Sequence, residues 1–399
     1  MKELKKGTIS TPLGFKTNAL WCGLKKKKFD LALIYSIVRA RSAGVFTRNK
    51  VKAAPVELGI KNLKDNHAQA IIINSGNANC CTGKRGKEDA LLITKLLAAQ
   101  LKLKTKDVLM SSTGVIGKYL AKEKIISSLP ELAGGLGFNN AHKTAQAIMT
   151  TDTFSKQVAV EIKIKNKPVT VAAVAKGAGM ICPNMATMLC FVTTDANIEQ
   201  AALKKALKTA VDASFNCISI DGQMSTNDSV IIMANGLAAN AMIRENSRES
   251  GIFVQALKHV CLELAKMIIK DAEGATKFIE INIKGARNRK AANTAAMAIA
   301  NSMLVKTMIA GNNPNWGRIP AALGAAGIDL DQEKMELSLQ KKVVYKNAKP
   351  VLKDQLSLIN SLKKKDINIT VNLNNGSFEH TVFSSDLTVE YVKVNMAYN

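Results

Sequence analysis

Segments with a strand pattern alternate with segments of helical periodicity along most of the chain. The clearest strand pair is residues 156–179, where two alternating runs flank a turn at 166–168. Apolar residues at helical spacing predict helices at about 87–102, 198–213 and 247–271. Because some strands are joined by hairpins and others by helices, the pattern predicts a layered α/β fold with mixed, partly antiparallel sheets.

Shorter apolar runs complete this picture. We expect strands at 31–35, 45–47, 69–74 and 304–311. From about residue 330 the sequence becomes strand-rich, with more lysine and asparagine, and this change predicts a smaller C-terminal α/β subdomain. A chain of 399 residues is long enough for two such cores.

The net charge of +25 raises the question of a nucleic-acid partner. Lysines cluster at 25–28 and 363–365, but no aromatic residues interleave with them, so stacking platforms for bases are absent. We therefore expect a solvated, lysine-rich surface and no nucleic-acid partner. A basic surface also attracts acidic substrates, and a basic nucleic-acid-binding protein remains an alternative.

Other classes are disfavoured by what the sequence lacks. No run of eighteen apolar residues occurs, so we expect no membrane span. The N-terminus has no apolar signal segment, which predicts a cytoplasmic protein. The seven cysteines include no CxxC pair, and we expect them to be reduced and not to bind zinc.

Six loops of glycine and small polar residues stand out against these apolar segments. Such loops place backbone N–H groups and short hydroxyls close to a ligand. They are NSGNAN (74–79), SSTGVIG (111–117), KGAGM (176–180), SIDGQMSTND (219–228), DAEGATK (271–277) and GNNPNWGRI (311–319).

Thr187, within GMICPNMATML (179–189), poses a chemical problem. A threonine hydroxyl needs a base, and none of the four histidines lies in the small-residue loops. If the peptide bond before Thr187 breaks, its new α-amino group, with a pKa near 8, becomes that base. An N-to-O acyl shift achieves this break: Thr187 Oγ attacks the Ala186 carbonyl, and water then hydrolyses the ester. The residue chemistry leaves open the alternative of an ordinary threonine at the start of a strand.

The sequence resembles the ornithine acetyltransferase (glutamate N-acetyltransferase) family of arginine biosynthesis from about residue 7 to 398. The segment KGAGMICPNMATMLCFVTTDA is similar to the family's self-processing segment. Further matching motifs, in chain order, are SAGVFTRNKVKAAPV, NSGNANCCTG, SSTGVIG, IMTTDTFSKQ, STNDSV, DAEGATK and LVKTMIAGNNPNWGRI.

This resemblance implies self-cleavage between Ala186 and Thr187, giving an α chain of residues 1–186 and a β chain of residues 187–399. The two chains are expected to form an α2β2 assembly with a helix–sheet–sheet–helix core. Thr187 would then carry acetyl from N-acetylornithine to glutamate, and acetyl-CoA is a further possible donor. No metal or organic cofactor is implied.

The resemblance also assigns roles to individual residues. Thr113 and Gly114 correspond to the oxyanion hole, Thr187 to the nucleophile, and Ala186–Thr187 to the cleavage site. The substrate-binding positions that it implies are Thr150 or Thr151, Lys176, Thr187, Glu273 and Asn395.

Some positions depart from the family pattern. The chain stops at Asn399, where the family continues to a terminal hydroxyl residue, and Gln223, Met224 and Asn313 replace commoner residues. A related self-processing amidase or aminopeptidase, which releases the acyl group to water, is the alternative within the same chemistry.

Overall fold

The computed structural model describes residues 1–182 and 188–397, which form two compact units. Unit 1 comprises residues 1–177, 188–216 and 224–268, and unit 2 comprises 178–182, 217–223 and 269–397. The long segment of unit 2 thus begins well before the change expected near residue 330. The reason is that Ile281, before that point, shares a buried core with Leu337 and Val371, after it.

Unit 1 contains a mixed sheet in the strand order β1-β6-β7-β8-β10-β3-β4-β5, with β2 paired to β3. The β8–β10 and β4–β5 pairs are parallel, and the other pairs are antiparallel. The strands are β1 (Lys2–Glu3), β2 (Phe15–Leu20), β3 (Leu31–Phe46), β4 (His67–Asn77), β5 (Val108–Val115), β6 (Lys156–Ile164), β7 (Lys167–Lys176), β8 (Leu189–Thr194) and β10 (Ser229–Ala234).

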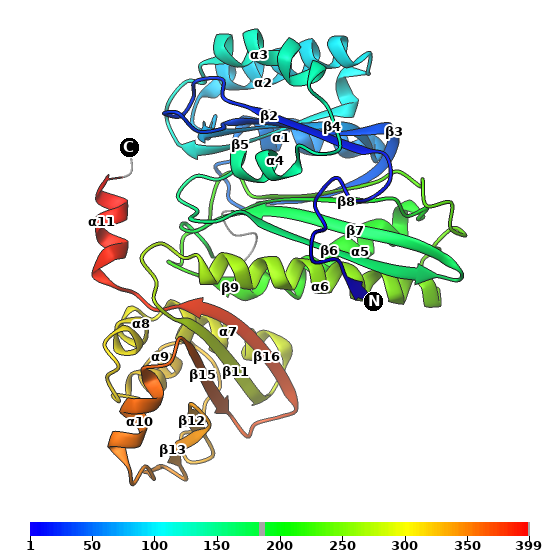
Figure 1. Cartoon of the computed structure of the whole chain (residues 1–399). Coiled ribbons are helices and arrows are strands. Elements are labelled where there is room, and N and C mark those ends of the chain that lie inside the picture. Colours follow the sequence, from blue (N-terminus) through cyan, green and yellow to red (C-terminus); the bar gives the residue numbers. More distant parts are fainter. Residues whose placement is uncertain (183–187, 398–399) are drawn as a thin grey trace. The chain divides into compact units, whose positions relative to one another are not determined.

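Most helices of unit 1 cover its two outer faces, but α4 (Ala141–Ala147) packs inside the unit, where Ala145 shares a core with Ile34 and Phe191 (Figure 1). The other helices are α1 (Ala54–Asn62), α2 (Gly83–Leu101), α3 (Lys122–Gly134), α5 (Gln200–Asp212) and α6 (Arg248–Lys270), with short 3-10 turns η1 (Leu63–Asp65), η2 (Thr105–Asp107) and η3 (Phe215–Cys217). Figure 1 shows α2 and α3 over strands β2–β5, and α5 and α6 beyond strands β6–β8. Two parts of this one mixed sheet thus form the inner layers, in the expected helix–sheet–sheet–helix order (Figure 1).

One long strand replaces the two short strands expected at 31–35 and 45–47. The first half of β3 pairs with β2 and β4, and its last six residues pair with β10. Between them the β3–β4 register is irregular from Tyr35 to Ala40, but the strand continues through this stretch. Its side chains reach two cores. Leu33 packs with Ile72 and Ile93 on one side, whereas Ile34 packs with Phe191 on the other.

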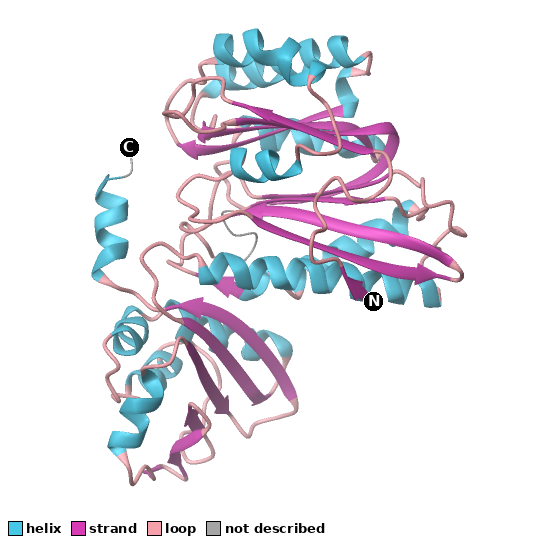
Figure 2. Ribbon diagram, viewed as in Figure 1, coloured by secondary structure: helices cyan, strands magenta, loops and turns pink. Residues whose placement is uncertain are grey.

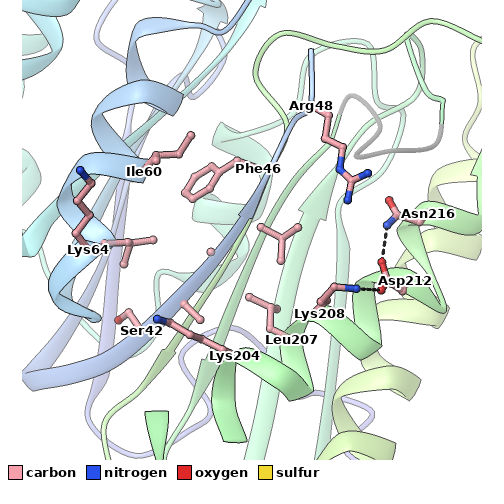
Figure 3. Close-up of a pocket in the computed structure, with 14 residues that line it drawn as sticks. Ser42, Phe46, Arg48, Ile60, Lys64, Lys204, Leu207, Lys208, Asp212 and Asn216 are labelled. Atoms are coloured by element: carbon pink, nitrogen blue, oxygen red, sulfur yellow. Dashed lines mark hydrogen bonds and ion pairs between the residues drawn. The ribbon is translucent and has the colours of Figure 1, made fainter. Parts of the chain in front are cut away.

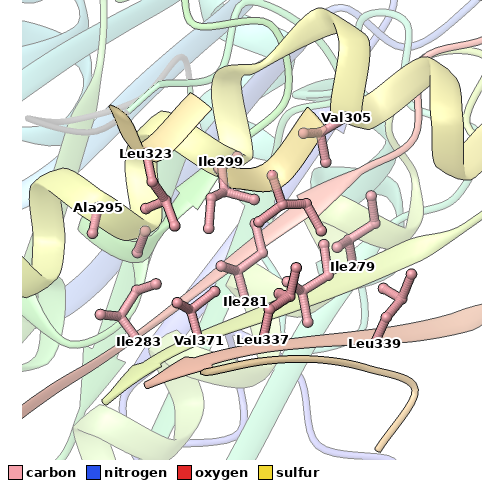
Figure 4. Packing of buried hydrophobic residues seen from close by; sticks show 14 of the residues in the cluster. Ile279, Ile281, Ile283, Ala295, Ile299, Val305, Leu323, Leu337, Leu339 and Val371 are labelled. Carbon is pink, nitrogen blue, oxygen red and sulfur yellow. The ribbon is translucent and has the colours of Figure 1, made fainter. Parts of the chain in front are cut away.

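Unit 2 contains a second mixed sheet, in the order β14-β13-β12-β15-β11-β16-β9. Figure 2 shows the strands and helices of this unit, and Figure 4 shows isoleucine, leucine and valine side chains from them meeting in its core. Its elements are β9 (Ile218–Ser219), β11 (Phe278–Ala286), α7 (Arg289–Asn301), α8 (Met303–Ala310), α9 (Arg318–Gly324), β12 (Glu336–Leu339), β13 (Lys342–Lys346), β14 (Lys349–Pro350), α10 (Gln355–Leu362), β15 (Asp366–Asn372), β16 (Phe378–Ser385) and α11 (Val389–Ala397).

The strand expected at 304–311 was wrong, because this segment forms helix α8. The Ser302 side chain accepts a hydrogen bond from the Val305 amide and so caps the helix N-terminus. A short apolar run has no periodicity that separates a buried helix from a strand, and the cap decides between them.

Candidate active site

The last residue of β7 is paired with the first residue of the neighbouring antiparallel strand β8. Lys176, the last residue of β7, pairs with Leu189, and Leu189 pairs in turn with Ser229 at the start of β10. Leu189 follows Thr187 by two positions in the chain. The predicted cleavage residues Ala186 and Thr187 themselves lie outside the described residues.

The Lys176 ammonium joins two of the predicted site residues. Its Nζ lies 2.8 Å from Thr150 Oγ1 and 3.4 Å from Thr113 Oγ1, and the side chain is almost completely buried. Thr151 makes no side-chain hydrogen bond with the described residues. Of the two neighbouring threonines, Thr150 is therefore the one in contact with Lys176.

Asp152 organises this group, although we did not predict it. Its carboxylate accepts hydrogen bonds from Lys156 Nζ at 2.8 Å, the Gly177 amide at 2.6 Å and the Thr150 amide at 3.0 Å, and it lies 4.0 Å from Lys176 Nζ. Burial acts to raise the pKa of Asp152, but the charges of Lys176 and Lys156 outweigh it and lower the pKa to about 2. The carboxylate is thus ionised and fixes Thr150 and the end of β7.

Gly114 occupies a position that only glycine fits. It pairs with Gly76 of β4 and has φ of +131°. A Cβ atom there would lie 2.4 Å from the Gly76 carbonyl carbon and 2.5 Å from the Asn77 nitrogen. The backbone of the predicted oxyanion turn can therefore approach β4 this closely only without a side chain.

Three of the small-residue loops are joined by hydrogen bonds at this end of unit 1. Asn227 Nδ2 donates to the carbonyl oxygens of Ala78 and Ser112, at 2.7 and 2.8 Å. Ser112 Oγ donates to Asn74 Oδ1 at 2.6 Å. These bonds hold the residue preceding Thr113 in place from two sides.

Asp228 is a second carboxyl group that we did not predict. It lies just before β10, is 1% exposed, and accepts a hydrogen bond from the Met188 amide at 2.9 Å. Burial raises its pKa well above the usual carboxyl range, although the Met188 amide, the Ser225 side chain and the Lys176 charge lower it in part. Burial of Asp228 therefore favours the protonated form of its carboxyl group.

Lys25 departs from the solvated surface expected for residues 25–28. Its Nζ donates to the Met149 carbonyl at 2.9 Å, and the surrounding turn folds around the buried Asp30. Burial is the main cause that lowers the pKa of Lys25 to about 8. The charges of Lys28 and Lys176 act in the same direction, against Asp30 and Asp152.

Glu273 and Asn395, two further predicted site residues, contact each other within unit 2. Asn395 Nδ2 on α11 donates to Glu273 Oε2 at 2.8 Å, and the Glu273 amide donates to the Ala178 carbonyl at 2.9 Å. A Cβ atom on Gly179 would lie 2.4 Å from the Glu273 carboxylate. Glycine at 179 therefore makes room for this carboxylate.

Unit 1 also contains a pocket of about 520 Å³ between β3, α1 and α5 (Figure 3). Phe46, Ile60 and Leu207 form part of its apolar lining, and Lys208 at its edge is paired with Asp212 at 2.5 Å. None of the predicted site residues lines this pocket, so it is separate from the candidate active site.

Within residues 1–182 and 188–397, no cluster of three or more histidine, cysteine, aspartate or glutamate side chains could hold a metal ion. None of the helices in these ranges has the length and apolar character needed to cross a membrane.

Comparison with known proteins identifies the family. The family model described as the ArgJ family matches residues 16–399. The chain belongs to the ArgJ family. The arginine biosynthesis bifunctional protein ArgJ of Caldanaerobacter subterraneus is 46% identical over 99% of both chains, and that of Lactococcus lactis is 46% identical over 100% of both.

A solved ArgJ structure matches only about half of this chain, unlike the two relatives, which match almost all of it. The crystal structure of the arginine biosynthesis bifunctional protein ArgJ from Bacillus halodurans matches with 39% identity and a TM-score of 0.50. The match covers 98% of that chain but only 52% of this one. The matched ArgJ polypeptide is therefore about half as long as the two curated relatives.

Sequence reasoning missed Asp152, Asp228 and Lys25 at this site. Both aspartates lie in motifs that resemble the family, TTDT and STND, but aspartate in a loop of small residues usually indicates a turn. Lys25 lies in a run of four lysines, and such a run usually indicates a solvated surface.

Proposed function

We propose that this chain transfers an acetyl group from N-acetylornithine to glutamate through an acetyl ester on Thr187. Membership of the ArgJ family over residues 16–399 supports this activity, and the relatives are named as arginine biosynthesis proteins. The observation that carries the proposal is the Thr113–Thr150–Lys176 group, level with the strand that starts just after Thr187.

Self-cleavage before Thr187 prepares the nucleophile. The freed α-amino group then acts as the base for the Thr187 hydroxyl, since its pKa lies near neutrality. Two further observations support a division of the chain. The matched Bacillus halodurans polypeptide has about half the length of the curated relatives, and residues 187–399 are slightly more than half of this chain.

Thr113 and Gly114 are proposed to stabilise the negatively charged oxygen in both reactions. Oxyanion holes require donors that are fixed before the reaction, because no reorganisation is then needed in the transition state. Thr113 is 5% exposed, and the steric limit at Gly114 keeps the backbone of this turn in one position.

The substrate groups are proposed to be recognised by charge. Lys176 is suited to the α-carboxylate that acetylornithine and glutamate share, with Thr150 beside it. Glu273 is suited to a substrate amino group, and Asn395 holds one of its oxygens. Because both substrates carry the same carboxylate, one pocket can bind each in turn around a single acetyl-threonine.

Several finer properties belong to this proposal. The chemistry requires no metal or organic cofactor. Acetyl-CoA is a second acetyl donor, in keeping with the word bifunctional in the relatives' names. We place the enzyme in the cytoplasm as an α2β2 assembly.

An acetyl-transfer assay tests the activity. The purified protein is incubated with N-acetylornithine and glutamate, and ornithine and N-acetylglutamate are measured by mass spectrometry. We expect both products in equal amounts, and none with Thr187→Ala. Loss of acetylornithine at the same rate without glutamate would instead indicate the related amidase. A parallel reaction with acetyl-CoA and glutamate determines whether that donor is used.

A further inference from the structure

Asp228 has one carboxyl oxygen that is poorly paired. Its Oδ1 accepts the Met188 amide, whereas its Oδ2 is buried and has no hydrogen bond of good geometry among the described residues, although the Ser225 side chain lies close enough to lower the pKa. Burying a polar atom in this way costs free energy, and native proteins keep such exceptions mainly where they serve a purpose. The residue that donates a hydrogen bond to Asp228 indicates what this purpose is.

The Met188 amide belongs to the residue that follows Thr187. Consecutive backbone nitrogens are joined through one Cα and one carbonyl carbon, so they lie less than about 4 Å apart in any conformation. The hydrogen bond from Met188 therefore joins this carboxyl group to the residue directly after Thr187 in the chain. That nitrogen is the leaving group when the Ala186–Thr187 bond is cut.

Self-cleavage needs an acid–base group that the mature enzyme does not need. Before the cut, the nitrogen of Thr187 is an amide and cannot act as a base, and it must gain a proton as it leaves. Among the described residues, the groups that act on Asp228 are the Met188 amide, the Ser225 side chain and the Lys176 ammonium. Its raised pKa favours the protonated form, which can supply this proton.

We propose that Asp228 is the proton donor for cleavage between Ala186 and Thr187, a role that rests on the proposed function. Thr187 Oγ forms a bond to the Ala186 carbonyl carbon, and the bond from that carbon to the Thr187 nitrogen breaks. Asp228 gives its proton to the departing nitrogen and recovers one from the Thr187 hydroxyl. The amide thus becomes an ester and a free amine, and water then hydrolyses the ester.

The test is the rate of self-cleavage of newly synthesised precursor, followed by intact mass, in Asp228→Asn and in a matched control. Asparagine keeps the oxygen that accepts the Met188 amide but has no acidic proton. We expect cleavage to slow by roughly one hundred to ten thousand fold, the usual contribution of a general acid or base. Thermal unfolding of the variant shows whether it is folded.

The matched control is Asp195→Asn. Asp195 is also buried in unit 1, burial likewise raises its pKa, and it accepts the Leu13 and Thr170 amides at 3.0 and 2.8 Å. It lies eight positions beyond Thr187, and we expect its variant to cleave at the wild-type rate. An equal loss in both variants would overturn the proposal, because it would reflect the removal of any buried acid.

Asp228→Glu decides the matter if the asparagine variant does not fold. The longer side chain retains the acidic proton, so we expect slower but measurable cleavage; a folded, uncut Glu variant would overturn the role. Cleavage of folded Asp228→Asn at the wild-type rate would also overturn it while leaving the proposed function intact. A wild-type chain that stays uncut would instead remove the proposed function itself.

Discussion

The charge of Lys25 depends on the side chains packed around it. Its pKa of about 8, caused mainly by burial, means that the ammonium is charged below pH 8 and becomes neutral as the pH rises through that value. Lys176 is close enough to contribute to this shift, so Lys25 adds positive charge near the proposed carboxylate site. Acidic substrates should bind best in the charged state.

We therefore expect the KM for glutamate to rise by roughly three- to tenfold between pH 7 and 9, as an interaction of about 1 kcal/mol is lost. Steady-state kinetics measure this change. Lys25→Met should raise KM at pH 7 and flatten its dependence on pH, whereas Lys26→Met, at an exposed position, should change neither. An equally steep dependence in Lys25→Met would assign the pH effect to another group.

At the scale of elements, Asp152 connects the loop after α4 to the start of β6 and the end of β7. It bonds Lys156 of β6, which is completely buried, and the Gly177 amide that follows β7. Its pKa is lowered from 3.8 to about 2 in the folded protein, which corresponds to about 2 kcal/mol of stability. This contribution is present above about pH 4 and is lost as the pH falls towards 2.

Asp152→Asn should lower the free energy of unfolding at pH 7 by about 3–5 kcal/mol, because it leaves the Lys156 charge buried without its carboxylate. Urea unfolding at pH 7 and pH 3 measures the effect, and the difference between variant and wild type should shrink at pH 3. The exposed Glu88→Gln, in a surface pair with Lys84, should change stability by less than about 0.5 kcal/mol. A similar small change in Asp152→Asn would contradict the structural role of Asp152.

Elements with a clear periodicity could be predicted from the sequence, whereas short or interrupted ones could not. The hairpin of β6 and β7 and the long helix α6 follow from strict alternation and helical spacing. The β3 strand was divided because its middle contains exposed Val38 and Arg39, and α8 was misassigned because its apolar run is only eight residues long. Pairing with distant strands makes β3 one strand, and the Ser302 cap makes the apolar run of α8 a helix.

In the candidate site, too, sequence motifs identified some residues, whereas properties that depend on tertiary packing could not be predicted. The resemblance selected Thr113, Lys176 and either Thr150 or Thr151. The structure places the side chains of Thr113 and Thr150 in hydrogen-bond contact with Lys176. Glu273 and Asn395 also contact each other. The burial that sets the charge states of Asp152 and Asp228 depends on strands distant in the chain, so the sequence could not predict it.

At the scale of the whole molecule, the compact units do not follow the expected cleavage site. Unit 1 takes residues from both sides of position 187, and unit 2 does so as well. The β7–β8 and β10–β3 ladders connect residues before and after that position within one sheet. We therefore expect the two chains to remain associated after a cut, because separation would break a continuous sheet.

The central claim is that the protein makes its own nucleophile at Thr187. The most direct measurement is the intact mass of the purified, denatured full-length protein, with and without prior addition of N-acetylornithine. The account predicts two polypeptides, residues 1–186 and 187–399, and a gain of one acetyl group on the second after the donor is added. A single uncut chain, or an acetyl group on the first polypeptide, would contradict it.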